Sequence, residues 1–457
     1  MPEIAAAMAR IRGLRDSLLQ SGGERLHHST ALSDIRHVVI INSASRSGSS
    51  LLFALLSMLP QVCSPNGETN PFYKLNISLN DYDPHVSDRI PSDLLDTAID
   101  HEGLSRDLLD DLRLAGHETI TARIDAERYI DDLILRLLLQ WTDLECETAG
   151  LRACVSGVFE RYAERNRHFD TTGFYLDLLE QLHATWPRIN PFYYDIGTDR
   201  VALRFPFLEV PAAPPVSGFT IEEPPFILLP PRRQPKPADL ACKTLLLKST
   251  VDCYRMNLIE RLFPRADIRI IHLVRNPAAT INGLYDGWLH RGFFSHNLAH
   301  RFGGETPDRL RIAGYSDRFP HAATWWNFDL PPGWEAYIER DLVDVCAFQW
   351  HSANSEILQH FATTERPVCT IHFEDLIRFP GARQSAFELM LDFMGLPSED
   401  LEHIPLDNLP VVQSTLPPQL YRWKHRRDMI ERVLAAPHIV AMAETFGYRR
   451  DTMEGWL

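Results

Sequence analysis

The sequence predicts an α/β fold in which helices cover both faces of a central parallel sheet. Near residue 36, a β-branched apolar segment is followed by a loop of small residues and then by a helix. Strand-sized and helix-sized segments alternate again after residue 240. Such alternation is typical of a parallel sheet, because each connection must cross a face of the sheet. Between these regions lies a long stretch that is first helical and then rich in proline, which predicts a large insertion.

The first strand–helix unit occupies residues 36–59. Arg36–Asn42 is rich in Val and Ile, which favour strands. Residues 43–49 are small and polar, and Ser50–Leu59 is predicted to be a helix that stops at Pro60, because proline cannot continue a helix. This order of strand, polar loop and helix places the loop at the end of a buried strand.

The region after residue 240 returns to the same alternation. We expect strands at 244–247, 268–274 and 368–372, and helices at 252–262, 277–284 and 384–393. Pro277 stands in the first turn of its helix, where its missing N–H has no partner to lose. The stretch 288–345 carries four tryptophans and is predicted to be a second, smaller insertion.

The segment 76–239 does not follow the strand–helix pattern. Residues 123–139 are predicted to be helical, whereas 206–237 contains so many prolines that a wrapping loop or lid is expected. We therefore assign 1–35 to an N-terminal helix, 36–75 and 240–457 to the core, and 76–239 to an insertion that binds an acceptor or covers it.

Composition and charge exclude some classes of function. The 457 residues carry a net charge of -15, so the basic footprint of a nucleic-acid-binding protein is missing. Seven cysteines form no C-x-x-C pair, which favours reduced thiols in a cytoplasmic protein. No apolar run approaches the ~18 residues that span a bilayer, and no signal peptide is expected.

The first residues are predicted to form an amphipathic helix. Its apolar side chains recur at helical spacing and are Ile4, Met8, Ile11, Leu14 and Leu18. We expect this stripe to pack on the rest of the domain or on a partner chain, so a homo-oligomer through this helix is one possibility. Docking on a membrane surface is the alternative.

The loop Ser43–Ser50 (SASRSGSS) has the properties of an anion site. Its small residues let backbone N–H groups face a bound phosphate, and the helix that starts after it adds its positive end. Hydroxyls at Ser47, Ser49 and Ser50 add donors, and Arg46 adds a permanent charge. A Walker A loop would place Lys after Gly48, where this chain has Ser49, so an ATP or GTP hydrolase is disfavoured.

These residues resemble a known family. Residues 46–52 (RSGSSLL) resemble the 5'-phosphosulfate loop of PAPS-dependent sulfotransferases (PAPS is 3'-phosphoadenosine 5'-phosphosulfate), in the R-x-G-[TS]-[TS]-L-L version of bacterial and tyrosylprotein members. The resemblance implies a P-loop-like three-layer fold with a central parallel sheet, PAPS as sulfuryl donor, and PAP as product. Many cytosolic members have an adenine-stacking Trp where this chain has Leu51, so the adenine contact is not identified.

A second motif of this family follows far along the chain. Residues 269–277 (RIIHLVRNP) end a predicted strand at Arg275 and resemble the element that holds the 3'-phosphate of PAPS. The family usually has Ser eight residues later, where this chain has Gly283. Thr280, Asn282 or the backbone N–H of residue 283 could take its place.

Further matches to the family lie in the core. They are Leu247–Thr250, Leu262–Pro264, Phe373–Leu376 with Pro380, Phe393–Pro397, and Ser414–Thr415 with Trp423–Lys424, of which the last resembles a segment that returns to cover the donor phosphates. The resemblance covers about 36–75 and 240–450, and leaves 76–240 unexplained.

The resemblance also implies catalytic roles. Charge grows on the leaving oxygen during in-line sulfuryl transfer, and Arg46 and Lys248 are the candidates to stabilise it. Glu68, in a G-E-T stretch similar to the G-E-E-T of tyrosylprotein sulfotransferases, is the predicted base. The rival histidines are His85, His101, His117, His183, His290 and His296. No metal is expected.

The predicted cofactor-binding residues are Arg46, Ser47, Gly48, Ser49, Ser50, Arg275, Asn282, Gly283 and Ser414. The insertion and the tryptophans favour a small, partly apolar acceptor, such as a secondary metabolite or a lipid-like alcohol, with a hydroxyl or an amine as the sulfated group. The alternatives are a P-loop-type nucleotide-dependent kinase and a non-catalytic nucleotide-binding protein.

Overall fold

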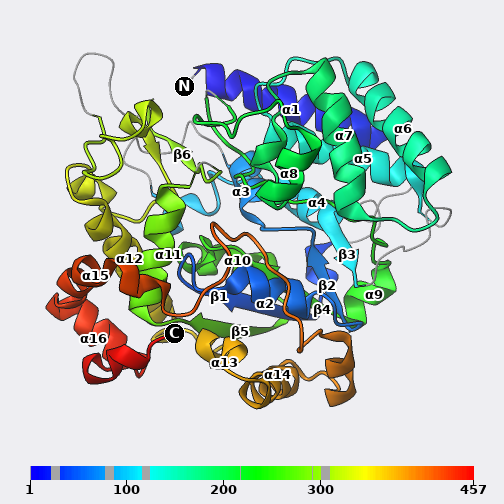
Figure 1. Ribbon diagram of the computed structural model, residues 1–457. Helices are drawn as coiled ribbons and strands as arrows, with labels where there is room; N and C mark the ends of the chain where they lie inside the picture. Colours follow the sequence, from blue (N-terminus) through cyan, green and yellow to red (C-terminus); the bar gives the residue numbers. More distant parts are fainter. Residues whose placement is uncertain are drawn as a thin grey trace.

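A six-stranded sheet lies at the centre of the molecule (Figure 1). The computed structural model describes residues 2–21, 31–77, 87–115, 124–216, 218–290, 292–299 and 309–457. The strand order is β3-β2-β4-β1-β5-β8, and every neighbouring pair is parallel except β2 and β3. The strands are β1 (His37–Asn42), β2 (Val62–Pro65), β3 (Leu112–Leu114), β4 (Thr244–Lys248), β5 (Asp267–Val274) and β8 (Val368–His372).

The first strand, β1, occupies the middle of the sheet, between β4 and β5. Ile41 of β1 pairs with Lys248 of β4, and Asn42 pairs with His272 of β5. The chain moves to one side of β1 to form β2 and β4 and to the other side to form β5 and β8. In such sheets a ligand binds outside the carboxyl end of the strand at which the order reverses, which here is the end of β1.

Helices cover both faces of the sheet, as the alternation of side chains along β1 requires. Val39 and Ile41 belong to a buried cluster with α2 (Ser49–Leu56) and α14 (Pro380–Met394). Val38 and Ile40 face the other way, into a cluster that contains α10 (Met256–Leu262) and the insertion helices. The expected α/β fold, with helices on both faces of a central and mostly parallel sheet, is thereby confirmed.

The remaining helices are assigned as follows. The N-terminal region and the insertion contain α1 (Pro2–Ser21), α3 (Asn70–Asn76), α4 (His101–Asp111), α5 (Ala126–Gln140), α6 (Thr148–Arg165), α7 (Thr171–Thr185), α8 (Thr198–Arg204) and α9 (Pro237–Cys242). The C-terminal part contains α11 (Pro277–Trp288), α12 (Leu342–Phe361), α13 (Phe373–Ile377), α15 (Arg427–Leu434) and α16 (Pro437–Thr445). A two-stranded sheet pairs β6 (His296–Asn297) with β7 (Trp325–Trp326).

The insertion helices stack on one side of the sheet, at the upper right of Figure 1. Between α8 and α9, the described residues 205–216 and 218–236 contain no helix or strand, as the prolines predict. The insertion also supplies β3, whose Leu114 pairs with Cys63 of β2 and extends the core sheet. That strand was not predicted, because three residues are too few to show a period. The assignment of 76–239 as a separate unit stays a prediction.

The N-terminal helix packs on its own chain. Met8, Ile11 and Leu18 are buried in the cluster that includes α5. Arg10 donates hydrogen bonds of 2.8 Å to the carbonyl oxygens of Thr142 and Leu144. The apolar stripe is therefore used within the chain, and a homo-oligomer through this helix stays a prediction. Among the described helices, none is both long enough and apolar enough to cross a bilayer.

The segment 252–262 is not one continuous helix. Asp252–Tyr254 forms a 3-10 turn, and α10 begins only at Met256. Arg255 leaves the helical region, with φ of -131°, and its guanidinium donates to Asp88 and to Asn70. A buried polar network thus overrides the local helical preference, which sequence periodicity does not reveal.

Candidate active site

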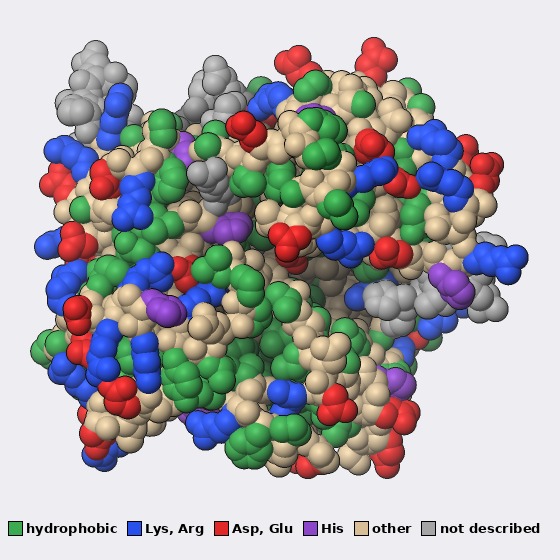
Figure 2. Space-filling model, in the orientation of Figure 1, with side chains coloured by type: hydrophobic (Ala, Val, Ile, Leu, Met, Phe, Trp, Pro, Cys, Tyr) green, Lys and Arg blue, Asp and Glu red, His purple; other side chains and the backbone are tan. Residues whose placement is uncertain are grey.

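A large cavity opens at the carboxyl end of β1. Its volume is about 420 Å³. It is lined by the predicted anion-binding loop at residues 43–50, called the phosphate loop below, by α11, by residues 221–227 of the insertion, and by the C-terminal segment 409–423. Figure 2 shows this face hollowed between the insertion and the C-terminal part of the chain. Segments that lie far apart in sequence therefore meet around one space, at the edge where the sheet predicts a ligand.

The phosphate loop turns sharply at two positions. Gly48 has φ of +96° and caps the N-terminus of α2, and Arg46 has φ of +65°. The ring of Phe373 lies against Gly48, so an added Cβ would come within 2.1 Å of its Cε2 atom. The first N–H groups of α2 have no partners within the helix and are available to an anion. Ser49 and Ser50 line the cavity, whereas Ser47 is buried beside it.

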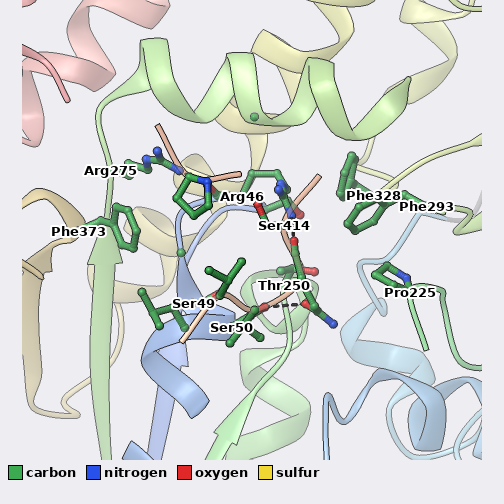
Figure 3. Close-up of a pocket in the computed structure, with 18 of the residues that line it drawn as sticks. Arg46, Ser49, Ser50, Pro225, Thr250, Arg275, Phe293, Phe328, Phe373 and Ser414 are labelled. Atoms are coloured by element: carbon green, nitrogen blue, oxygen red, sulfur yellow. Dashed lines mark hydrogen bonds between the residues drawn. The ribbon is translucent and has the colours of Figure 1, made fainter. Parts of the chain in front are cut away.

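Partly buried arginines gather beside this loop (Figure 3). Arg275, directly after β5, donates a 3.1 Å hydrogen bond to the carbonyl oxygen of Arg46, and its guanidinium lies over the ring of Phe373. Burial, with the charges of Arg275 and Arg422, lowers the pKa of Arg46 to about 10. The Arg275 Nε atom is buried without a hydrogen-bond partner. Like charges buried together are costly, so this cluster is suited to a bound anion.

Helix α11 holds the third arginine in place. Asp286 forms ion pairs with Arg422 at 2.9 Å and with Arg426 at 2.7 Å. Asn282 lines the cavity, and its side-chain oxygen accepts a 2.6 Å hydrogen bond from Arg426. The sequence had not singled out Asp286, Arg422 or Arg426. Ion pairing between segments this far apart leaves no local pattern.

Gly283 has a steric role in this arrangement. A Cβ at position 283 would lie 3.3 Å from the Cβ of Arg46, which is tighter than ordinary contact. The glycine found where the family usually has Ser therefore lets Arg46 approach α11 closely.

Glu68 and Lys248 meet at the opposite wall of the phosphate loop. Lys248, buried at the end of β4, forms an ion pair with the Glu68 Oε1 atom and donates a 2.9 Å hydrogen bond to Ser50. Ser249 donates to the other carboxylate oxygen of Glu68 at 3.3 Å. Glu68 lines the cavity, and Lys248 acts from behind it. The structure thus brings together the three residues predicted to be catalytic, Glu68, Lys248 and Arg46, around Ser50 and the loop.

The C-terminal segment closes the cavity on the side of Arg46. Gln413, not predicted from the sequence, accepts a 2.9 Å hydrogen bond from Arg46 at its carbonyl and a 2.7 Å bond from Ser50 at its side chain. Ser414 lines the cavity, but its hydroxyl donates to the carbonyl of Leu416. Lys424 instead donates to the carbonyl of Glu454, away from the cavity.

Those rival histidines that the structure describes do not line the cavity. His85 and His117 lie outside the described residues. His101 and His183 are bound to the backbone carbonyls of Leu95 and Ile189, and His296 lies 3.5 Å from an oxygen of Asp88. The remaining candidate, His290, is partly buried close to Arg46, and the partial burial and the charge of Arg46 lower the pKa of His290 to about 4. Among the described candidates for the base, Glu68 is the one that faces the space.

Backbone strain is concentrated at this cavity. Four non-glycine residues of the described chain have a positive φ, and all four line the cavity: Arg46, Phe328, Gln413 and Tyr421. Left-handed backbone at a non-glycine residue is costly and persists where surrounding contacts hold it, which is typical of functional sites.

The wall of the cavity beyond Glu68 is mostly apolar. It comprises Pro71, Ile221, Pro224, Pro225, Ile227, Phe293 and Phe328. From the sequence, the wall could be assigned only to the proline-rich stretch and the second insertion, and its individual residues were not predicted. In the described residues, no group of three or more His, Cys, Asp or Glu side chains is arranged to hold a metal ion.

Comparison with known proteins gives little more. No protein-family model and no curated protein matches the chain. Among solved structures, the sulfotransferase domain from the curacin biosynthetic pathway is 12% identical, with 91% of this chain and 99% of that chain covered and a TM-score of 0.35.

Two further solved structures give similar values. The sulfotransferase domain from the Synechococcus PCC 7002 olefin synthase is 14% identical, with 93% of this chain and 99% of that chain covered and a TM-score of 0.32. Sulfotransferase STF1 from Mycobacterium tuberculosis H37Rv is 10% identical, with 94% of this chain and 83% of that chain covered and a TM-score of 0.32. Scores of this size do not decide the activity, which must be inferred from the site.

Replacing Gly48 with Ala is expected to destabilise the protein and weaken anion binding. Gly447 also has a positive φ, but an added Cβ there meets nothing within 4 Å, so Gly447→Ala is the matched control. We expect the control to lose about 1 kcal/mol from backbone strain, and Gly48→Ala to lose a further ~1–3 kcal/mol from the clash with Phe373. Chemical unfolding measures both losses. Equal losses in the two variants would contradict this account of the loop.

Two buried carboxyl groups near the site predict a pH-dependent stability. Burial raises the pKa of both Asp252 and Asp329 to about 7. The folded protein then holds protons that the unfolded chain releases near pH 4, so stability should fall as the pH rises from about 4 through 7. In Asp252→Asn this fall should be smaller, with a higher Tm than wild type at pH 8 and a similar one at pH 4. If the difference in Tm between Asp252→Asn and wild type stays constant from pH 4 to pH 8, Asp252 does not cause the pH dependence.

Proposed function

We propose that this chain is a sulfotransferase that moves a sulfuryl group from PAPS to a hydroxyl or amine of a small, partly apolar acceptor by in-line displacement. The observation that carries the proposal is the cluster of partly buried arginines beside the phosphate loop, with the Glu68–Lys248 pair on the other side of the loop. One arrangement thereby offers an anion site, a base and an apolar wall around a single cavity.

The residues present fit a doubly phosphorylated donor. Arg46, Ser49, Ser50 and the start of α2 form the site for the 5'-phosphosulfate, as their resemblance to the family loop implies. Arg275 stands at a strand end where a second phosphate would be bound, with a buried Nε atom that has no partner. Two neighbouring guanidinium groups and one carboxylate act on Arg46, so the cluster carries excess positive charge.

The reaction needs stabilisation of negative charge and removal of one proton. PAPS supplies the sulfuryl group, and charge develops on the oxygen that joins sulfur to the 5'-phosphate. Arg46 in the loop and the buried Lys248, which is hydrogen-bonded to Ser50, supply positive charge at the site. Glu68 faces the cavity and takes the proton of the acceptor hydroxyl or amine. Lys248 and Ser249 hold the two oxygens of the Glu68 carboxylate in position.

The proposal includes a cytoplasmic enzyme that takes part in secondary metabolism. All seven cysteines are free thiols in the structure, which is typical of proteins in a reducing compartment. The apolar wall beyond Glu68 suits a small acceptor with apolar parts better than a highly charged one.

The donor can be identified by following which label moves. The protein is incubated with PAPS labelled in its sulfuryl group, or with ATP labelled in its γ-phosphoryl group, and with a library of small alcohols and amines. We expect transfer from PAPS only, because the loop lacks the Walker lysine and carries Arg46 instead. Transfer from ATP with PAPS inert would establish the kinase alternative. Tight nucleotide binding with no transfer from either donor would favour a binding protein.

Variants at Arg46 and Glu68 should separate donor binding from chemistry. For Glu68→Gln we expect the affinity for PAP to be kept and kcat to fall by roughly 10²-fold or more, the scale of one acid–base group. For Arg46→Ala we expect both PAP affinity and turnover to be lost while the fold is retained. PAP affinity is measured by calorimetry, turnover with labelled PAPS, and the fold by circular dichroism.

Matched controls are available on the surface. Glu339→Gln and Arg449→Ala alter exposed residues that are paired locally with Arg311 and Asp451, and they should leave turnover unchanged. Wild-type kcat in Glu68→Gln would remove Glu68 from the mechanism. Wild-type kcat in Arg46→Ala would do the same for the loop arginine.

A further inference from the structure

We propose that Phe328 determines which acceptors fit, and that the acceptor end of the cavity takes an uncharged alcohol that carries an apolar ring. This inference rests on the proposed function, because an acceptor exists only if the chain transfers a group. The binding site itself follows from the contacts of Phe328. Nothing in the phosphate-loop or strand-end motifs refers to this residue.

The acceptor end is the part of the cavity that Phe293, Phe328 and Pro225 line. Figure 3 shows these three residues together on the right of the view, away from Arg275 and Phe373 on the left. The two phenylalanine rings lie 5.3 Å apart between centroids, and the guanidinium of Arg46 lies over the ring of Phe293. A flat apolar group at this end would pack against the phenylalanine pair, with the neighbouring proline adding apolar surface.

Apart from Arg46, which belongs to the arginine cluster at the donor end, the charged groups at this end are already paired. Arg136 binds Glu222 at 3.0 Å, and Lys74 binds Glu223 at 2.7 Å. An acceptor with its own charge would have to be desolvated here beside groups whose charges are balanced, which is unfavourable. The pairing therefore favours an uncharged molecule.

Phe328 is held in a strained conformation by a chain of hydrogen bonds. Its φ is +62°, and its N–H donates a 2.9 Å hydrogen bond to the Ser295 hydroxyl. Ser295 in turn donates a 2.7 Å bond to one oxygen of Glu223. The other oxygen of Glu223 accepts bonds from Lys74 at 2.7 Å and from Asn70 at 3.1 Å. The chain Lys74–Glu223–Ser295 thus fixes the backbone of Phe328 from the insertion side.

The two neighbours of Phe328 are fixed from the core side. Gln349 donates hydrogen bonds to the carbonyl oxygens of Asn327 at 2.9 Å and Asp329 at 2.7 Å. The carboxyl group of Asp329 accepts a 2.8 Å bond from Ser45 of the phosphate loop. Residues 327 and 329 are therefore held in place on either side of Phe328, and Asp329 connects this segment to the phosphate loop through Ser45.

A glycine on α11 makes room for the Phe328 ring. An added Cβ at Gly287 would lie 2.2 Å from Cζ of Phe328 and 2.7 Å from its Cε2 atom. Gly283, one helical turn earlier, accommodates Arg46 in the same way. A larger residue at position 287 would push the ring toward the cavity and narrow the acceptor end.

The test measures binding of 2-naphthol, a fluorescent uncharged ring alcohol, to the full chain saturated with PAP. The variants are Phe328→Ala, Gly287→Ala, their double variant and Ser295→Ala, with Phe207→Ala as the matched control because that phenylalanine is exposed elsewhere. We expect 2-naphthol affinity to fall about tenfold in the first two single variants and several-fold in Ser295→Ala, with PAP affinity within twofold of wild type throughout. The control should bind like wild type.

The double variant distinguishes a specific contact from general damage. If Gly287→Ala acts by displacing the Phe328 ring, it should cause no further loss once that ring has been removed. The charged analogue 6-hydroxy-2-naphthoate should bind wild type at least tenfold more weakly than 2-naphthol. Unchanged 2-naphthol affinity in Phe328→Ala, additive losses in the double variant, or equal affinity for the charged analogue would each overturn the proposal.

These measurements are independent of sulfuryl transfer. If 2-naphthol binds as expected but no label moves from PAPS to any alcohol, the site at Phe328 stands and the proposed function fails. If label moves from PAPS but the affinity for 2-naphthol is the same in Phe328→Ala and wild type, the proposed function stands and the inference fails.

Discussion

The site depends on holding the guanidinium of Arg46, partly removed from water and close to other arginines, at the end of the central strand. Removing a charge from water is costly, and Arg275 and Arg422 add repulsion, which together lower the pKa of Arg46. The structure offsets this cost with the carbonyl of Gln413, the face of Phe293 and the charge of Asp286. Each of these groups comes from a different segment, so the constraint draws those segments together around one cavity.

Helix α11 is the element that meets this constraint on both sides of the cavity. Its glycines at 283 and 287 are one turn apart, and they receive Arg46 and Phe328, two residues with left-handed backbone. Asp286, between the two glycines in sequence, holds Arg422 and Arg426. The same helix therefore sets the distance of closest approach at the phosphate loop and at the apolar wall. In the proposed enzyme it would couple the donor end to the acceptor end through packing alone.

Sequence reasoning was most successful where structure is local. The strands at 244–247, 268–274 and 368–372 and the loop–helix after β1 are found close to their predicted bounds. It failed where long-range contacts decide the outcome. The short strands β2 and β3 show no period, and the predicted helix 252–262 breaks because Arg255 turns to Asp88 and Asn70. The four tryptophans of the second insertion are buried, which the sequence could suggest but not place.

The sequence by itself determined the phosphate loop around Arg46, the strand-end Arg275 and the candidate base Glu68. Each of these belongs to a short motif with its own local geometry. Only the tertiary structure decided that Lys248 reaches Glu68, that Asp286 holds the C-terminal arginines, and that Glu223 and Ser295 fix Phe328. The physical reason is that buried charges and strained backbone are stabilised by partners far away in the chain, such as Arg426 and Asn282, which are 144 residues apart. No local pattern records such partners, because any segment that the fold brings near could supply them.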